Sequence, residues 1–229
     1  MVEPVRLNII VEGQTEETFV RDVLREHLAA HQVYVSARRV ETKRDQKKSQ
    51  TYRGGISTYV KARADIERWL KEDKQAHLTT MFDLYGLPDD FPNIIKARKK
   101  ADPYQKVKLI ETGMSADIQN PRFIPYVQLY EYEGLLFSHV DAIDKELSIF
   151  GVSKLDDLQD IRKQFKTPEE INDGLATAPS KRLIGLYPAY NKVVFGVLIA
   201  KRIGLELMRR ECPHFHEWLL TLESLGQQQ

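Results

Sequence analysis

The sequence contains one cysteine, Cys212, among its 229 residues. A single cysteine excludes an internal disulfide, and without a CxxC pair a cysteine-based structural zinc site is excluded too. No apolar run approaches the roughly 20 residues that a membrane-spanning helix needs. The first residues, MVEPVRLNIIVEG, lack the basic start and long apolar stretch of a secretory signal. We therefore expect a reduced, cytoplasmic protein with no membrane partner.

The sequence also has no large excess of charge of either sign, because it contains 34 Lys and Arg residues and 33 Asp and Glu residues. This balance argues against a protein that is basic all over and binds nucleic acid indiscriminately, although local basic patches remain compatible with it. Hydrophobic residues make up 42% of the chain, enough for a substantial core. A wholly disordered chain is thereby excluded.

Short β-branched runs alternate with segments of helical periodicity in the first part of the chain. The predicted strands are residues 5–11, 33–37, 77–82 and 123–130. The predicted helices are residues 14–31, 56–72 and 93–119, the last interrupted near Pro103, and residues after 131 look helical almost to the end. This order predicts an α/β fold with a Rossmann-like parallel sheet of about four strands flanked by helices, and a mostly helical C-terminal half. We expect a core over residues 1–138 and a helical region over 139–229 packed on it.

Acidic residues follow three of the four predicted strands. They are Glu12 after the first strand, Asp83 after the third, and Glu131 and Glu133 after the fourth, with Glu16 on the first turn of the first helix. The carboxyl ends of parallel strands meet at one edge of a sheet, where functional sites of such folds gather. Crowded carboxylates favour a hard cation such as Mg²⁺ or Mn²⁺. The alternative is that each acid caps a helix or is solvated.

The first acidic segment carries a family resemblance. Residues 11–16, VEGQTE, resemble the VEGxTE motif that opens the TOPRIM domain of overcoming-lysogenization-defect (OLD) nucleases. In that family this glutamate and a DxD pair after a later strand hold divalent metal for phosphodiester chemistry. By this resemblance Glu12 and Glu16 match the first motif, and Asp83 matches the first acid of the second.

Other segments resemble a TOPRIM-like bacterial family described as a domain of unknown function. They are TTMFDLYGLPDDFP, FIPYVQLYEYEGLLFS, EEINDG, TAPSKR and ECPHFHEW, spread over residues 79–218. Genes of this group often stand beside ATPase genes in defence-type loci. The resemblance therefore implies a TOPRIM-like fold and a nuclease that works with an ABC/AAA-type ATPase partner.

The second acid of the DxD pair is replaced here by Tyr85. A phenol is a poor Mg²⁺ ligand beside a carboxylate. Three alternatives stay open: Asp89, Asp90, Glu131 or Glu133 substitutes for the missing acid, the site binds a single metal, or the site is catalytically inactive.

Two basic segments are candidates for binding phosphate. The long polar loop after the second strand contains Arg39, Lys43, Arg44, Lys47, Lys48 and Arg53, and a later segment contains Ser180, Lys181 and Arg182. A basic loop can follow a nucleic-acid backbone, and a helix that starts at Pro179 or Ser180 would offer amides and cations to a phosphate. A solvated loop and an ordinary capped helix are the alternatives. The Walker pattern GxxxxGK[ST] is absent, so ATP hydrolysis by this chain is not expected.

These features together predict a metal-dependent nuclease acting on DNA or RNA. Glu12, Asp83, Glu16 and Glu133 are the expected metal ligands, Glu131 is a further catalytic candidate, and Lys181 is expected to neutralise charge on the phosphate. The main alternative is a catalytically inactive TOPRIM-like subunit of an ATPase complex. A nucleotide-handling α/β enzyme is less favoured, since no Gly-rich phosphate loop is present, and a homo-oligomer stays open.

Overall fold

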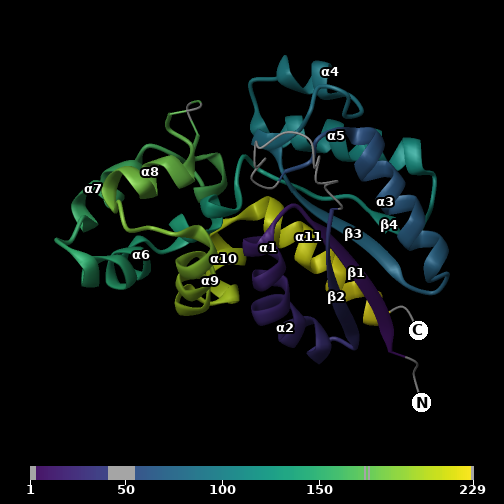
Figure 1. Cartoon of the computed structure of the whole chain (residues 1–229), viewed down its shortest axis with the longest axis horizontal. Helices are drawn as coiled ribbons and strands as arrows, with labels where there is room; N and C mark the ends of the chain where they lie inside the picture. Colours follow the sequence, from purple (N-terminus) through teal and green to yellow (C-terminus); the bar gives the residue numbers. More distant parts are fainter. Residues whose placement is uncertain (1–3, 41–54, 173, 175, 228–229) are drawn as a thin grey trace, which may run out of the picture.

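Five short strands form one parallel sheet, which runs obliquely through the molecule in Figure 1. The structure is a computed structural model that describes residues 4–40, 55–172, 174 and 176–227. The strands are β1 (Val5–Val11), β2 (Val33–Arg39), β3 (His77–Asp83), β4 (Phe123–Ile124) and β5 (Val127–Gln128). Their order is β2-β1-β3-β4, β5 also pairs with β3, and every pairing is parallel. The predicted α/β class and parallel sheet are confirmed.

The strand predicted at residues 123–130 is divided into β4 and β5 at Pro125. β4 pairs with the beginning of β3 and β5 with its end. Pro125 has no N–H to donate to a ladder. Thr80 bridges the gap, because its hydroxyl donates to the carbonyl of Tyr126 at 2.9 Å and accepts from the amide of Tyr126 at 3.0 Å. A buried side chain thus replaces the missing backbone hydrogen bonds.

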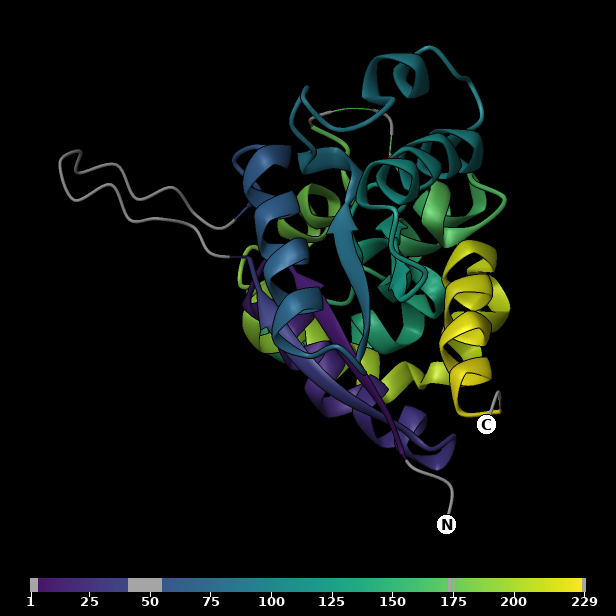
Figure 2. The same cartoon turned by 90° about the vertical axis from the view of Figure 1, so that its right-hand side faces the viewer.

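One face of the sheet is covered by α3 (Tyr59–Glu72) and α5 (Pro103–Ile118), and α4 (Ile94–Arg98) packs on α5; a short turn η2 (Leu84–Gly86) follows β3. Asp102 caps α5 by accepting from the amide of Tyr104 at 2.9 Å, and Pro103 suits the first helical position. The predicted interruption near Pro103 is therefore confirmed. Figure 2 shows α3 and α11 on opposite sides of the strands.

The opposite face is covered by the helix that follows β1 and by the C-terminal helices. The first helix runs through α1 (Gln14–Phe19), a π-helical turn η1 (Val20–Leu24) and α2 (Arg25–Ala30), so the helix predicted at residues 14–31 is confirmed. Leu7, Ile9 and Val11 of β1 join the apolar core on this side, whereas Ile10 joins the core under α3 and α5. This alternation is the period of two that a strand imposes.

The chain after β5 is helical, as predicted. Its elements are η3 (Tyr132–Ser138), α6 (Val140–Leu147), η4 (Ser148–Phe150), α7 (Leu155–Lys163), η5 (Pro168–Glu170), α8 (Pro179–Leu186), α9 (Lys192–Ile203), α10 (Leu205–Glu211), α11 (Pro213–Ser224) and η6 (Leu225–Gln227). α8 begins at Pro179, as expected, and α9 ends at Gly204, whose φ of +81° suits glycine. Among the residues that the structure describes, no helix combines the length and apolarity of a membrane span.

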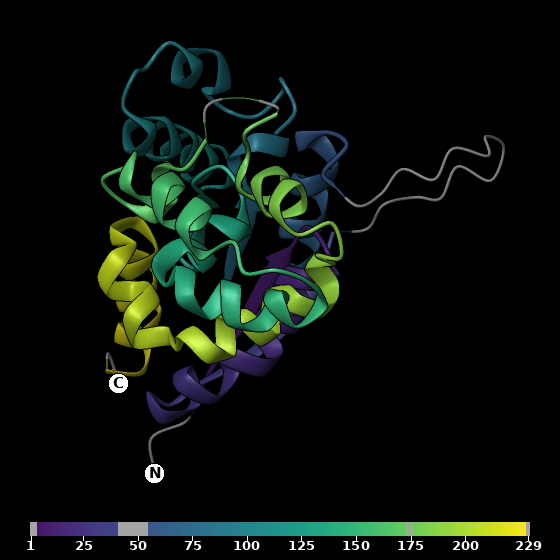
Figure 3. The same cartoon turned by 90° about the vertical axis from the view of Figure 1, so that its left-hand side faces the viewer.

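Helices α6, α7 and α8 lie in front of the sheet in Figure 3, on the side toward which the strands point. The core on the α1 side contains residues from both halves of the chain, such as Phe19 and Phe215, whose ring centroids are 6.2 Å apart. The two halves therefore share a core. A domain boundary at residue 138 stays a prediction.

Candidate functional site

A cavity of about 570 Å³ lies where the carboxyl ends of the strands meet α8 and α9. It is lined by acidic residues from three separate segments and by residues of the two helices. They are Glu12, Gly13, Gln14, Thr15, Glu16, Asp83, Glu131, Ser180, Lys181, Ile184, Tyr190, Asn191, Lys192 and Val193. The parallel sheet brings Glu12 and Asp83 together because β1 and β3 are neighbours and end at the same edge.

Backbone amides hold three of the carboxylates in place. Glu12 Oε1 accepts from the amide of Asp83 at 2.7 Å, and Asp83 Oδ1 accepts in turn from the amide of Tyr132 at 3.0 Å. Glu131 Oε2 accepts from the amide of Ser180 at 2.9 Å. Within the described residues, the second oxygen of each of these carboxylates has no hydrogen bond. Each acid is thus oriented through one oxygen while the other stays available.

Several buried polar atoms at the cavity have no partner in the described part of the chain. Glu133 is 2% exposed and its Oε1 accepts no hydrogen bond, and the hydroxyls of Thr15 and Tyr190 are also buried and unpaired. Glu16 is 3% exposed, and its Oε2 lies 3.0 Å from where a Cβ on Gly13 would stand. Buried polar groups in proteins are nearly always paired, so a concentration of unpaired ones is typical of a ligand-binding site.

Burial and mutual repulsion raise the pKa values of the acidic residues at the cavity. Burial raises the pKa of Glu12 to about 8; the amide of Asp83 opposes this increase and the charge of Glu16 adds to it. Burial also raises the pKa of Asp83 well above its usual value, with further contributions from Glu12 and Glu16. The pKa of Glu133 rises to about 7 through burial, partly offset by Lys192. The cluster therefore holds more negative charge than its surroundings stabilise.

Lys192 is the site residue that sequence reasoning missed. It is the first residue of α9, lies exposed at the rim of the cavity, and follows Asn191, whose side chain caps the helix by accepting from the amide of Val193 at 3.0 Å. Partial desolvation of its amino group lowers its pKa, but Glu133 and the other acids outweigh this, so the net pKa is raised. The positive charge of a lysine at a helix N-terminus is repelled by the positive end of the helix dipole. This unfavourable placement is the feature of the sequence that indicates a nearby acidic partner.

The residues present fit a hard divalent cation. Carboxylate oxygens are the ligands that Mg²⁺ and Mn²⁺ prefer, and an added positive charge would relieve the repulsion that raises these pKa values. The unpaired Oε1 of Glu133 and the available oxygens of Glu12 and Asp83 offer such ligands. The predicted ligand set of Glu12, Glu16, Asp83 and Glu133 therefore lies close together; its metal-binding role stays a prediction.

The structure places two predicted phosphate-binding residues outside the cavity. Arg39 pairs with Glu17 of α1 at 3.1 Å, and Arg182 donates to the carbonyl of Thr177 at 2.6 Å. Ser180 and Lys181 do line the cavity, but the amide of Ser180 is used by Glu131. The remaining predicted phosphate-binding residues lie outside the described residues: Lys43, Arg44, Lys47, Lys48 and Arg53.

Some of the acids considered as substitutes for the second DxD acid lie at the cavity and others lie away from it. Asp89 pairs with Arg98 at 2.6 Å, and Asp90 accepts from the amide of Tyr59 at the start of α3, so neither lines the cavity. Tyr85 is 36% exposed and does not line it either. Of the acids considered, Glu131 lines the cavity, and Glu133 lies near enough to Asp83 to raise its pKa, so these two stay the candidates.

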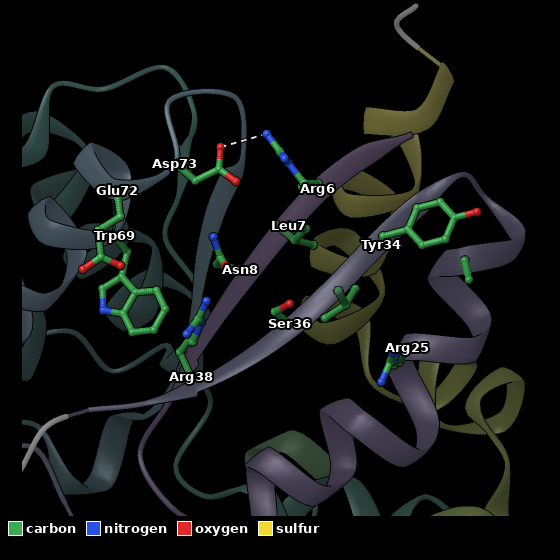
Figure 4. Close-up of a pocket in the computed structure, with 12 residues that line it drawn as sticks. Arg6, Leu7, Asn8, Arg25, Tyr34, Ser36, Arg38, Trp69, Glu72 and Asp73 are labelled. Carbon is green, nitrogen blue, oxygen red and sulfur yellow. Dashed lines mark hydrogen bonds and ion pairs between the residues drawn. The ribbon is translucent and has the colours of Figure 1, made fainter. Parts of the chain in front are cut away.

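A second groove, of about 590 Å³, lies between β1, β2 and α3 and is shown in Figure 4. Two pairs of its side chains interact: Arg6 pairs with Asp73 at 3.0 Å, and the guanidinium of Arg38 lies 3.7 Å from the ring centroid of Trp69. None of its described polar atoms is both buried and unpaired. The groove offers cations at the side of the sheet, but the convergent acids lie in the first cavity.

Comparisons with known proteins give a family and a distant structural likeness. The family model described as Domain of unknown function (DUF4276) matches residues 11–223. Two solved structures of the C-terminal region of the Xanthomonas campestris pv. campestris OLD protein, one phased with mercury and one with iodine, match with TM-scores of 0.48 and 0.47 and identities of 14% and 15%. Both cover 97% of this chain, which covers 97% and 96% of theirs. A comparison with curated proteins finds no match.

Proposed function

This chain belongs to the DUF4276 family, and from its acidic cavity we propose that it is a metal-dependent nuclease that hydrolyses phosphodiester bonds of DNA or RNA. The observation that carries the proposal is the convergence of Glu12, Asp83, Glu131 and Glu133 from different strand ends, beside the buried Glu16. The VEGQTE motif at residues 11–16, which resembles the TOPRIM motif of OLD nucleases, supports the same reading.

The cavity combines anionic ligands with nearby cations. Lys181 at the start of α8 and Lys192 at the start of α9 both line it opposite the acids. A site for a phosphodiester needs both signs of charge, because carboxylates hold the metal while lysines attract and stabilise the phosphate oxygens. This mixture distinguishes the cavity from a simple acidic patch.

Each residue has a role that follows from its position. Glu12, Asp83, Glu16 and Glu133 would hold Mg²⁺ or Mn²⁺, which when bound polarises the phosphate and lowers the pKa of a bound water. Glu131 is anchored through the Ser180 amide, so its remaining oxygen is positioned to orient a water or complete the ligand set. Lys181 and Lys192 place positive charge where the phosphate gains negative charge during the reaction.

Two parts of the proposal concern partners. Nucleic acid is the proposed substrate, and the basic residues of the 39–53 segment are proposed to contact its backbone. An ABC/AAA-type ATPase in a bacterial defence-type system is the proposed protein partner, and the family resemblance of the sequence segments is what supports it. A net charge of +1 implies weak attraction for nucleic acid by this chain alone, which favours such a partner.

The experiment uses isosteric variants that keep the amide anchors. Purified protein is incubated with supercoiled plasmid, single-stranded DNA and RNA in the presence of Mg²⁺, Mn²⁺ or EDTA. We expect cation-dependent cleavage that is lost in Glu12→Gln and Asp83→Asn, since both variants keep an oxygen for the neighbouring amide but lose the charge. Glu17→Gln, which changes the partly exposed neighbour of Glu16 that pairs with Arg39, is the matched control and should retain activity.

Cleavage that survives both Glu12→Gln and Asp83→Asn would refute the assignment. The inactive alternative rests on Tyr85, which replaces the expected second acid and lies outside the cavity. If no substrate is cut and Mn²⁺ shows no binding that depends on Glu12, the alternative of a catalytically inactive subunit of an ATPase complex is correct.

A further inference from the structure

A second group of metal-ligating side chains lies between α2 and α11, where His27 and Glu223 are in contact. His27 and His31 stand one turn apart on the same side of the first helix, and Glu223 reaches them from α11. The three ligand atoms lie within 4.8 Å of one another. This group is at the opposite end of the first helix from Glu16, so it is separate from the acidic cavity.

The distances suit a tetrahedral ion. His27 Nε2 is 2.6 Å from Glu223 Oε1, and His31 Nε2 is 4.0 Å from the same oxygen. Ligands held at about 2.0–2.1 Å around a tetrahedral ion lie roughly 3.3 Å apart. The first distance would need to lengthen and the second to shorten, each by less than about 1 Å, which side-chain rotation allows.

The surroundings of Glu223 resemble the outer shell of a metal site. Arg209 donates to both carboxylate oxygens, to Oε1 at 2.8 Å and to Oε2 at 3.1 Å, and its Nε donates to His216 Nδ1 at 3.1 Å. The contact with Oε2 can persist when Oε1 binds an ion, so Arg209 would hold the carboxylate in place as outer-shell groups do.

We propose that His27, His31 and Glu223 form a binding site for Zn²⁺ or a similar transition-metal ion, and that the ion fastens the end of α2 to α11. Two imidazoles and one carboxylate suit Zn²⁺, whereas Mg²⁺ prefers oxygen ligands alone. His27 and His31 are partly exposed, so an ion and a water in the fourth position have access from solvent. The position after His27 is Leu28, where the HExxH helix of a metalloprotease has its glutamate base, so the residues do not match that catalytic pattern.

The proposal is tested by titrating EDTA-treated full-length protein with Zn²⁺ in a calorimeter and by measuring Tm with and without the ion. We expect one Zn²⁺ per chain at this site and an increase in Tm of several degrees. His31→Ala should weaken the binding at least tenfold and remove the increase in Tm. Without zinc its Tm should stay near that of the wild type, because the His31 side chain is about one-third exposed and its ion pair with Glu223 is long, at 4.0 Å.

Two control variants separate this site from the rest of the chain. His139→Asn changes an exposed histidine that caps α6 into another good capping residue and should leave zinc binding intact. Glu12→Gln should also leave it intact, because Glu12 belongs to the acidic cavity. Co²⁺ in place of Zn²⁺ should give the visible absorption of a tetrahedral site in the wild type and lose it in His31→Ala.

Two results would overturn the proposal. Zinc binding that persists in His31→Ala but is lost in Glu12→Gln would place the ion in the acidic cavity. The absence of any zinc binding or Co²⁺ absorption in the wild type would show that His27, Glu223 and Arg209 form an ion-pair network alone.

Discussion

Replacing Glu133 by glutamine should stabilise the metal-free protein at alkaline pH and weaken its response to divalent cations. Glu133 is 2% exposed, and its Oε1 has no partner among the described residues. Its pKa is raised from 4.5 to about 7, mainly by burial. Between these two values the unfolded chain has lost the proton while the folded chain keeps it, so this group makes stability fall as the pH rises.

The size of the effect follows from the two pKa values. At about 1.4 kcal/mol per pH unit, the difference corresponds to a cost of about 3 kcal/mol at pH 8 and less than about 1 kcal/mol at pH 5. Glu133→Gln removes this cost because glutamine does not ionise. For a chain of this length we expect Tm to rise by roughly 6–12 °C at pH 8 and by a few degrees at most at pH 5.

The assay is urea and thermal unfolding in EDTA at both pH values, followed by the same measurements with Mn²⁺. Mn²⁺ should stabilise the wild type at pH 8 and stabilise Glu133→Gln less, since one ligand has lost its charge. Glu26→Gln, an exposed residue of α2, is the control and should change stability by less than about 0.5 kcal/mol. An equal change in stability at pH 5 and pH 8, or a loss of stability at pH 8, would refute the reasoning about buried charge.

Three further substitutions test the site and its supports. Lys192→Met should lower the cleavage rate by about 10²–10³, measured as kcat, because it removes a positive charge from the cavity; a change below threefold would contradict its role. Thr80→Val should destabilise the protein by about 1–3 kcal/mol in urea unfolding, since the amide and carbonyl of Tyr126 lose their buried partner, and an unchanged midpoint would show that the bridge contributes nothing. Gly196→Ala places a Cβ 3.1 Å from Thr15 Cγ2 and should shift α9, with a loss of about 1–3 kcal/mol and slower cleavage; full activity would show that α9 tolerates the displacement.

Much of the acidic site could be predicted because it follows from local rules. Glu12 and Asp83 each come directly at the end of a β-branched strand, and strands joined by helices run parallel, so their carboxyl ends meet. Glu131 follows the same logic although its strand is broken at Pro125. These residues line one cavity or, like Glu133, are electrostatically coupled to it.

The position of Lys192 at the cavity, by contrast, depends on how the helical half of the chain packs against the sheet. The segment around it is apolar and amphipathic, which indicates a helix but says nothing about which end faces the sheet. α9 packs against α1 through Gly196, which lies close to Thr15, and that contact brings Lys192 to the acids. The histidine pair at residues 27 and 31 is visible in the sequence, but Glu223 lies 196 positions from His27.

The sequence alone determined the first three strands, the class of fold and the acids at the strand ends, because period, β-branching and capping act over a few residues. Only the tertiary structure decided which carboxylate oxygens are used by the amides of Asp83, Tyr132 and Ser180 and which stay available. It also decided that Asp89 and Asp90 turn away from the cavity while Lys192 joins it. Hydrogen-bond partners and burial set the chemistry of a carboxylate, and both come from residues far apart in the chain.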